Sequence, residues 1–83
     1  MSDSSIDELS LKLEILLKKT FGVDSIDPES TMEDIPEWNS FKHLELIIEI
    51  EKEFQIKLEF TDTIKMNSIS LIKTKIIERL NDK

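Results

Sequence analysis

The sequence predicts a small all-α domain built on three long helices. Its 83 residues are enough for one domain, and we expect residues 1–83 to form a single one. Apolar residues recur at spacings of three and four in three separate segments, which is the periodicity of helices with one buried face. The one glycine, Gly22, and the two prolines, Pro28 and Pro36, all lie between the first and second of these segments. Neither residue type therefore interrupts a predicted helix.

The first helix is expected from about Ser5 to Phe21. Ser5 and Glu8 have the spacing of a capping box, in which each side chain accepts a hydrogen bond from the other residue's backbone N–H. The apolar face of this helix is formed by Ile6, Leu9, Leu13, Leu16 and Leu17. Gly22 follows directly and suits the left-handed conformation that ends many helices.

An irregular segment connects the first two helices, from residue 22 to residue 39. It contains six acidic residues and no basic residue. Long loops in compact domains are usually functional or disordered. Apolar residues punctuate this one, namely Val23, Ile26, Met32, Ile35 and Trp38. We therefore expect an ordered loop that is pinned to the core, with Trp38 as a core plug.

The second helix is expected from about Ser40 to Phe54, capped by Asn39 or Ser40. One apolar stripe consists of Leu46, Ile47, Ile50 and Phe54. A second stripe consists of Phe41, Leu44 and Ile48. Together they are wider than one core face needs, and exposed apolar patches flanked by charge often bind partners.

The last third of the sequence predicts a connector, a short turn and a helix. Residues 55–60 alternate apolar and polar side chains, but a lone strand has no pairing partner, so we expect an extended connector. A short helical turn is expected over residues 61–64. The last helix is expected to start at Asn67 or Ser68 and to bury Ile69, Ile72, Ile76 and Leu80. Lys73, Lys75 and Arg79 lie in its later turns, where cations suit the helix dipole.

Composition excludes several classes of function. Without cysteine the chain can have no disulfide, thiolate nucleophile or cysteine metal site. A net charge of −7 argues against a nucleic-acid partner and favours a basic protein partner. No apolar run is long enough to span a membrane, and the N-terminal residues do not resemble a signal peptide. We expect a cytoplasmic monomer. No metal site is expected either, because the acidic loop lacks the spacing of a calcium loop.

Ser40 and His43 lie one helical turn apart, and a Ser–His dyad is therefore conceivable. A Ser at a helix start is more often a cap, and we expect His43 to be a surface residue. A hydrolase also needs an oxyanion hole, a third group to orient the His and a pocket. The nearest candidates for that third group, Glu37 and Glu45, are flexible acids. We therefore do not expect the chain to be an enzyme, and we assign no catalytic residue.

One segment is explained as a unit by a resemblance. Residues 37–54 read EWNSFKHLELIIEIEKEF. They resemble the acyl carrier protein family, in which a Ser opens the second helix inside an Asp-Ser-Leu motif. That Ser is followed by the run apolar-Glu-Leu-apolar-apolar-x-apolar-Glu-x-Glu-Phe, which residues 44–54 match position by position. Trp38 and His43 also resemble small free-standing carriers with the pattern Trp-Asp-Ser-Leu-x-His. Two positions depart from the family pattern, since Asn39 replaces the Asp and Phe41 replaces the Leu.

The resemblance implies an acyl-carrier-like four-helix bundle, with three long helices, one short helical turn and a long loop between the first two helices. It implies that Ser40 carries a covalent phosphopantetheine, whose thiol holds an acyl or aminoacyl group as a thioester. The implied partners are a phosphopantetheinyl transferase and enzymes of acyl or aminoacyl loading and transfer, with basic docking patches. The positions that match the family's partner surface are Asn39, Phe41, Leu44, Glu45, Ile48 and Glu51.

The pathway stays open at this point, with lipid, secondary-metabolite and polysaccharide chemistry all possible. Asn39 also leaves an alternative open, because the family pattern has a negatively charged Asp at this position beside the implied modification site and Asn39 is neutral. In that alternative the chain is a carrier-like helical adaptor that binds basic protein partners without a prosthetic group.

Overall fold

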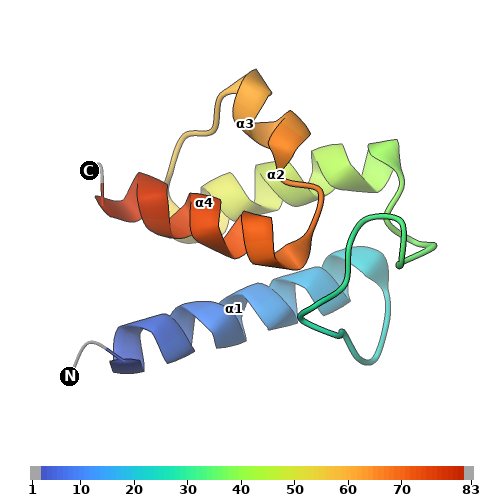
Figure 1. Cartoon of the computed structure of the whole chain (residues 1–83), viewed down its shortest axis with the longest axis horizontal. Coiled ribbons are helices and arrows are strands. Elements are labelled where there is room, and N and C mark those ends of the chain that lie inside the picture. Colours follow the sequence, from blue (N-terminus) through green and yellow to red (C-terminus); the bar gives the residue numbers. More distant parts are fainter. Residues whose placement is uncertain (1–2, 82–83) are drawn as a thin grey trace.

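The computed structural model describes the backbone of residues 3–81 and the side chains of residues 8–81. This part of the chain forms four α-helices: α1 (Asp3–Phe21), α2 (Ser40–Phe54), α3 (Phe60–Lys65) and α4 (Ile69–Asn81). The three long helices lie roughly along one another, and α3 lies across the top of the view in Figure 1. The loop between α1 and α2 lies at one end of the bundle, and α1 begins and α4 ends at the other (Figure 1). The predicted all-α fold, with three long helices and a short one, is confirmed.

The two ends of α1 differ in how well the sequence predicts them. The helix begins at Asp3, two residues earlier than expected, so Ser5 lies inside α1. The predicted capping box at Ser5 is therefore wrong, because a capping residue stands just outside the helix. The side chains of Ser5 and Ile6 lie outside the described residues. At the other end Gly22 has a φ of 70°, as predicted, and its N–H donates to the Lys18 carbonyl at 2.8 Å.

The core is a single cluster of large aliphatic side chains from the three long helices. Its most deeply buried members are Leu13, Leu17, Leu46, Ile50, Met66, Ile72 and Ile76. Met66, which follows α3, was not predicted to be buried; the other six come from the helix faces that the sequence periodicity predicts. Leu and Ile provide both the area removed from water and the close packing that stabilise such a small domain.

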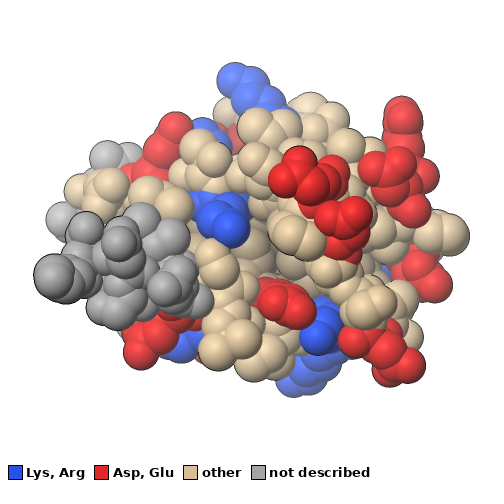
Figure 2. Space-filling view, turned by 60° about the horizontal axis from the view of Figure 1, so that its bottom comes forward, with Lys and Arg blue, Asp and Glu red and all other residues tan. Residues whose placement is uncertain are grey.

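The loop between α1 and α2 is fixed to the core, as predicted. Ile35 and Trp38 are buried, and Val23, Ile26 and Met32 pack against the same cluster. The loop also pairs with the segment before α4. The Met32 N–H donates to the Asn67 carbonyl at 2.8 Å, and the Ile69 N–H donates to the Ser30 carbonyl at 3.1 Å. Acidic side chains gather at this end of the molecule on the face shown in Figure 2.

The chain after α2 is extended and then turns into α3. Gln55 ends α2 in the left-handed conformation, with a φ of 55°, and its N–H bonds to the Glu51 carbonyl. The connector predicted over residues 55–60 is shorter than expected, because Gln55 ends α2 and Phe60 begins α3. Residues 56–59 form neither helix nor strand, and the backbone of Glu59 is extended. The short turn predicted over residues 61–64 is the centre of α3. Ser68 caps α4, because its Oγ accepts a hydrogen bond from the Leu71 N–H at 3.1 Å.

A buried carboxylate joins α3 to α4. Asp62 is 7% exposed, and its Oδ2 accepts hydrogen bonds from the Glu59 N–H at 2.9 Å and from the Arg79 guanidinium. Its Oδ1 lies 3.4 Å from the Lys75 ammonium. Lys75 and Arg79 were expected to act on the dipole of α4, but the structure shows that they also hold α3 in place. This ion-pair cluster could not be predicted from periodicity, because it joins two different helices.

Candidate functional site

The start of α2 presents the Ser40 hydroxyl at the surface. Asn39 is the N-cap, with extended backbone (φ −103°, ψ −177°), and its Oδ1 accepts a hydrogen bond from the Lys42 N–H at 2.9 Å. Ser40 is therefore the first residue of the helix and does not cap it. The Ser40 side chain is exposed. Of the two caps that the sequence left open, the structure selects Asn39.

The charges around Ser40 suit an anion. The first turn of α2 carries no acidic side chain, so the positive end of the helix dipole is not neutralised there. Lys42 is two residues away, and its ammonium lies 3.3 Å from the Glu45 carboxylate. Backbone N–H groups at a helix start can also donate to phosphate oxygens. The position can thus hold a phosphate ester on an exposed hydroxyl.

His43 is not available to activate Ser40. The indole N–H of Trp38 donates to His43 Nδ1 at 3.0 Å, and His43 Nε2 lies 2.7 Å from the Thr63 carbonyl oxygen. Both ring nitrogens are therefore occupied by structural partners. The expectation that His43 is a surface residue is wrong, because its ring is half-buried between the loop, α2 and α3. Trp38 is the core plug that the sequence predicts, at 3% exposed, and it packs against Phe21 with ring centroids 5.3 Å apart.

The second apolar stripe of α2 is exposed, as the sequence predicts. Phe41 is 72%, Leu44 is 63% and Ile48 is 55% exposed. Glu45 is exposed beside them. These side chains lie on the outer side of α2, in the two turns that follow Ser40. Their exposure leaves a large apolar area in contact with water, which is typical of a partner-binding surface.

Two further exposed apolar residues lie on α3. Phe60 is 77% and Ile64 is 60% exposed, and they lie four residues apart on one face of the helix. The contact between His43 and Thr63 holds α3 beside the start of α2. The i, i+4 spacing of Phe60 and Ile64 can be read from the sequence. Phe60 was nevertheless assigned to the connector, because it also fits the alternation of apolar and polar residues before it.

Glu51 has a structural role that the sequence does not reveal. Its Oε2 accepts a hydrogen bond from the Leu58 N–H at 2.9 Å, and the side chain is half-buried. Glu51 therefore fixes the connector against α2. Of the positions that match the family's partner surface, Asn39, Glu45 and Glu51 are all engaged within the protein, and Glu51 is the one that joins α2 to the connector.

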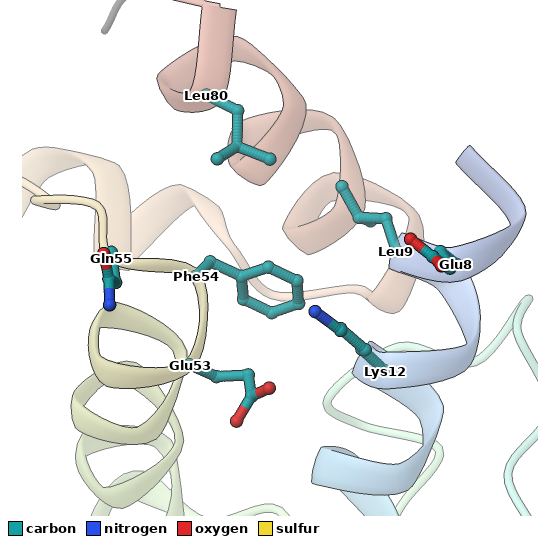
Figure 3. A pocket seen from close by; sticks show the side chains of 7 residues that line it. All are labelled: Glu8, Leu9, Lys12, Glu53, Phe54, Gln55 and Leu80. Carbon is teal, nitrogen blue, oxygen red and sulfur yellow. The ribbon is translucent and has the colours of Figure 1, made fainter. Parts of the chain in front are cut away.

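A hollow of about 290 Å³ lies at the far end of α2 from Ser40. Figure 3 shows the Phe54 ring in its centre, with Leu9 and Leu80 on two sides and Lys12 reaching toward the ring. The hollow is about 20 Å from Ser40 along the helix, since each residue adds 1.5 Å. It therefore takes no part in the site at Ser40.

The described part of the chain contains neither a cluster of metal ligands nor a helix that could span a membrane. Among the side chains of residues 8–81, no group of three or more His, Asp or Glu is placed to hold a metal ion. Of the helices in the described part of the chain, none combines the length and the apolar character that crossing a bilayer requires.

Comparison with solved structures identifies the fold class. The chain is similar to the solution NMR structure of a holo acyl carrier protein from Geobacter metallireducens, with a TM-score of 0.78 and 25% sequence identity. The match covers 86% of this chain and 84% of that protein. The expected acyl-carrier-like helical bundle is thereby confirmed, and the similarity supports an acyl-carrier-like role. No protein-family model matches the chain, and no curated protein matches it.

Proposed function

We propose that this protein is an acyl carrier protein that is modified with phosphopantetheine on Ser40. The observation that carries the proposal is the exposed Ser40 hydroxyl at the start of α2, in a fold similar to that of a holo acyl carrier protein. The carried group is an acyl or aminoacyl thioester on the arm's thiol. The chain has no cysteine of its own to compete with that thiol.

The residues around Ser40 fit the group. The Ser40 side chain is exposed, and no hydrogen bond engages its hydroxyl within the described residues. The Asn39 cap fixes the helix start through Lys42 N–H, so the hydroxyl is held on a rigid element. A phosphate attached there is stabilised by the positive end of the dipole, an effect of about 0.3–1 kcal/mol at an exposed site.

The attachment reaction needs no base from this chain. The Ser40 Oγ forms a new bond to the phosphorus that bears the pantetheine arm of coenzyme A, and the diphosphate P–O bond breaks. Adenosine 3′,5′-bisphosphate leaves with the bonding electron pair, and the hydroxyl proton goes to a base of the separate transferase. The engagement of His43 with Trp38 and Thr63 is consistent with this division of roles.

The proposed partner surface consists of Asn39, Phe41, Leu44, Glu45, Ile48 and Glu51, and we add Phe60 and Ile64 from the structure. It combines exposed apolar side chains with acidic ones and lies directly beside Ser40. A transferase or loading enzyme with a basic rim and apolar contacts complements it. Such docking is weak and salt-sensitive, because exposed charges act mainly on the encounter rate.

The decisive experiment measures the intact mass of the protein after incubation with coenzyme A, Mg²⁺ and a broad-specificity phosphopantetheinyl transferase. We expect the mass of one phosphopantetheine to be added to the wild-type protein and none to Ser40→Ala. Ser70→Ala is the matched control, because Ser70 is an exposed helical Ser on α4. It should be modified as the wild type is.

Two outcomes would overturn the proposal: no added mass in the wild-type protein, or an added mass that persists in Ser40→Ala. The first outcome, together with binding of a basic partner that is insensitive to Ser40→Ala, would favour the helical adaptor without a prosthetic group. That alternative uses the same exposed surface of α2 and differs only in the role of Ser40.

A further inference from the structure

His43 lies where three segments of the molecule meet. It belongs to α2, one turn after Ser40, and contacts the end of the loop through Trp38 and α3 through Thr63. The Trp38 and His43 rings are also close, with centroids 5.9 Å apart. This chain of two hydrogen bonds, from the Trp38 indole through the His43 imidazole to the Thr63 carbonyl, is called here the His43 bridge.

The partners of His43 determine its protonation state. An indole N–H can only donate, so His43 Nδ1 must be the acceptor and carries no proton. A carbonyl oxygen can only accept, so Nε2 must carry the proton and donate it to Thr63. The bridge therefore requires the neutral imidazole with its proton on Nε2. A second proton on Nδ1 would remove the acceptor for the buried Trp38 indole.

The charged groups on the three segments do not replace either bond. On α2, Lys42 pairs with Glu45. On α3, Asp62 is held by Arg79 and Lys75. The remaining neighbours in sequence, Glu37 on the loop and Lys65 on α3, are exposed. The imidazole thus joins the loop to α3 at this point.

We infer that His43 is a positioning residue, whose neutral imidazole holds Trp38 and α3 in fixed places on either side of the Ser40 helix start. Protonation of the ring breaks the bond to Trp38. It leaves the bond to Thr63 intact, since Nε2 keeps its proton. The loop end and α3 are thereby uncoupled beside the Ser40 helix start.

The test uses the fact that the chain contains one Trp and one His. NMR gives one indole N–H signal, and its exchange with solvent reports the bond from Trp38 to His43. We expect this exchange to be about fivefold to tenfold faster, at the same pH, in a variant that lacks an acceptor in place of Nδ1 than in the wild-type protein. The nitrogen shifts of His43 in the wild-type protein should be those of a ring with its proton on Nε2.

Two conservative variants separate the two bonds. In His43→Asn, the amide oxygen can take the place of Nδ1, so Trp38 stays protected while the amides of α3 exchange faster. In His43→Gln, the amide nitrogen can take the place of Nε2, so α3 stays protected while the Trp38 indole exchanges faster. An indole exchange rate in His43→Gln that equals the wild-type rate, or unchanged exchange of the α3 amides in His43→Asn, would overturn the inference.

A second measurement connects the His43 bridge to modification, and this part rests on the proposed function. The kcat/KM of Ser40 modification should fall in His43→Gln at about pH 8. The ratio of variant to wild type cancels the pH dependence of the transferase itself. If Ser40 is never modified, the exchange experiment still stands alone, so failure of the proposed function and failure of this inference are distinguishable. If the Trp38 indole exchanges faster in His43→Gln but kcat/KM is unchanged, the positioning role of His43 is contradicted.

Discussion

Asp62 is the buried carboxylate on which the position of α3 depends. The Glu59 N–H donates to it and lowers the pKa of Asp62 below its ordinary value. Burial opposes this effect, and hydrogen bonds from Arg79 and Lys75 add to it. Because the pKa is lower in the folded protein, Asp62 stabilises the fold at pH values above its unfolded pKa. That contribution is lost as the pH falls through the lowered folded value.

We predict that Asp62→Asn destabilises the fold by about 1–3 kcal/mol at neutral pH, because hydrogen bonds to charged groups contribute that much. Urea unfolding of both proteins at a series of pH values measures the difference. It should be constant above the ordinary Asp pKa of 3.8 and shrink as the pH falls further. Asp27→Asn, in the exposed loop, is the control. A difference that does not change with pH would show that the charge of Asp62 is not what matters.

Single residues were predictable where local chemistry decides their role. Asn39 and Gly22 act within their own helix ends; the sequence alone assigns Gly22 and narrows the cap of α2 to Asn39 or Ser40. His43 and Asp62 act on partners that are 20 and 17 residues away, respectively. Such partners follow from the way the helices pack, so no local pattern in the sequence indicates them.

At the level of elements, the start of α4 is where two distant parts of the chain meet. Ser68 caps the helix through the Leu71 N–H, and the same residue forms a β-bridge with Thr31 of the loop. The Ile69 N–H, a donor that the helix leaves unused, is satisfied by the Ser30 carbonyl. The start of α4 is therefore stabilised both by its own cap and by the loop.

Ser68→Ala is expected to destabilise the protein by about 1 kcal/mol, the usual effect of losing an N-cap side chain. Ser70→Ala is the matched control, because Ser70 is exposed two residues later in the same helix. It should change the free energy of unfolding by less than about 0.5 kcal/mol. Equal effects of the two substitutions in chemical denaturation would contradict the assignment of Ser68 as the cap.

Elements were predictable to the extent that their apolar spacing is regular. The long helices and their buried faces follow from spacings of three and four. The start of α1 was predicted two residues too late. Several residues near the N-terminus are of types that cap helices, so the sequence does not single out one of them. The length of α3 was missed because Phe60, although exposed, fits an alternating pattern as well as a helix.

At the level of the whole molecule, the uneven charge distribution is the feature most relevant to partners. Residues 1–41 contain 10 acidic and 3 basic residues, and the loop between α1 and α2 has no basic residue at all. Its acidic side chains lie at one end of the fold (Figure 2). A field of one sign over one end of a small protein accelerates encounters with an oppositely charged partner.

We predict that kcat/KM for modification by a transferase with a basic docking face falls about tenfold when the salt concentration rises from about 10 to about 150 mM. Glu45→Lys should lower it further, because Glu45 lies on the proposed docking surface. Glu33→Lys makes the same charge change in the exposed loop and is the matched control. If the two variants behave alike, only the total charge matters and Glu45 makes no specific contact.

The bridge between the loop and α4 also bears on how the protein resists proteases. An exposed acidic segment of this length would normally be an early cleavage site, because a protease must draw an extended stretch of chain into its active site. Here Thr31 is paired with Ser68, and Ile35 and Trp38 are buried near the end of the loop. A glutamate-specific protease can therefore reach these peptide bonds only after the loop has detached from α4, so cleavage there measures how often this happens in the folded protein.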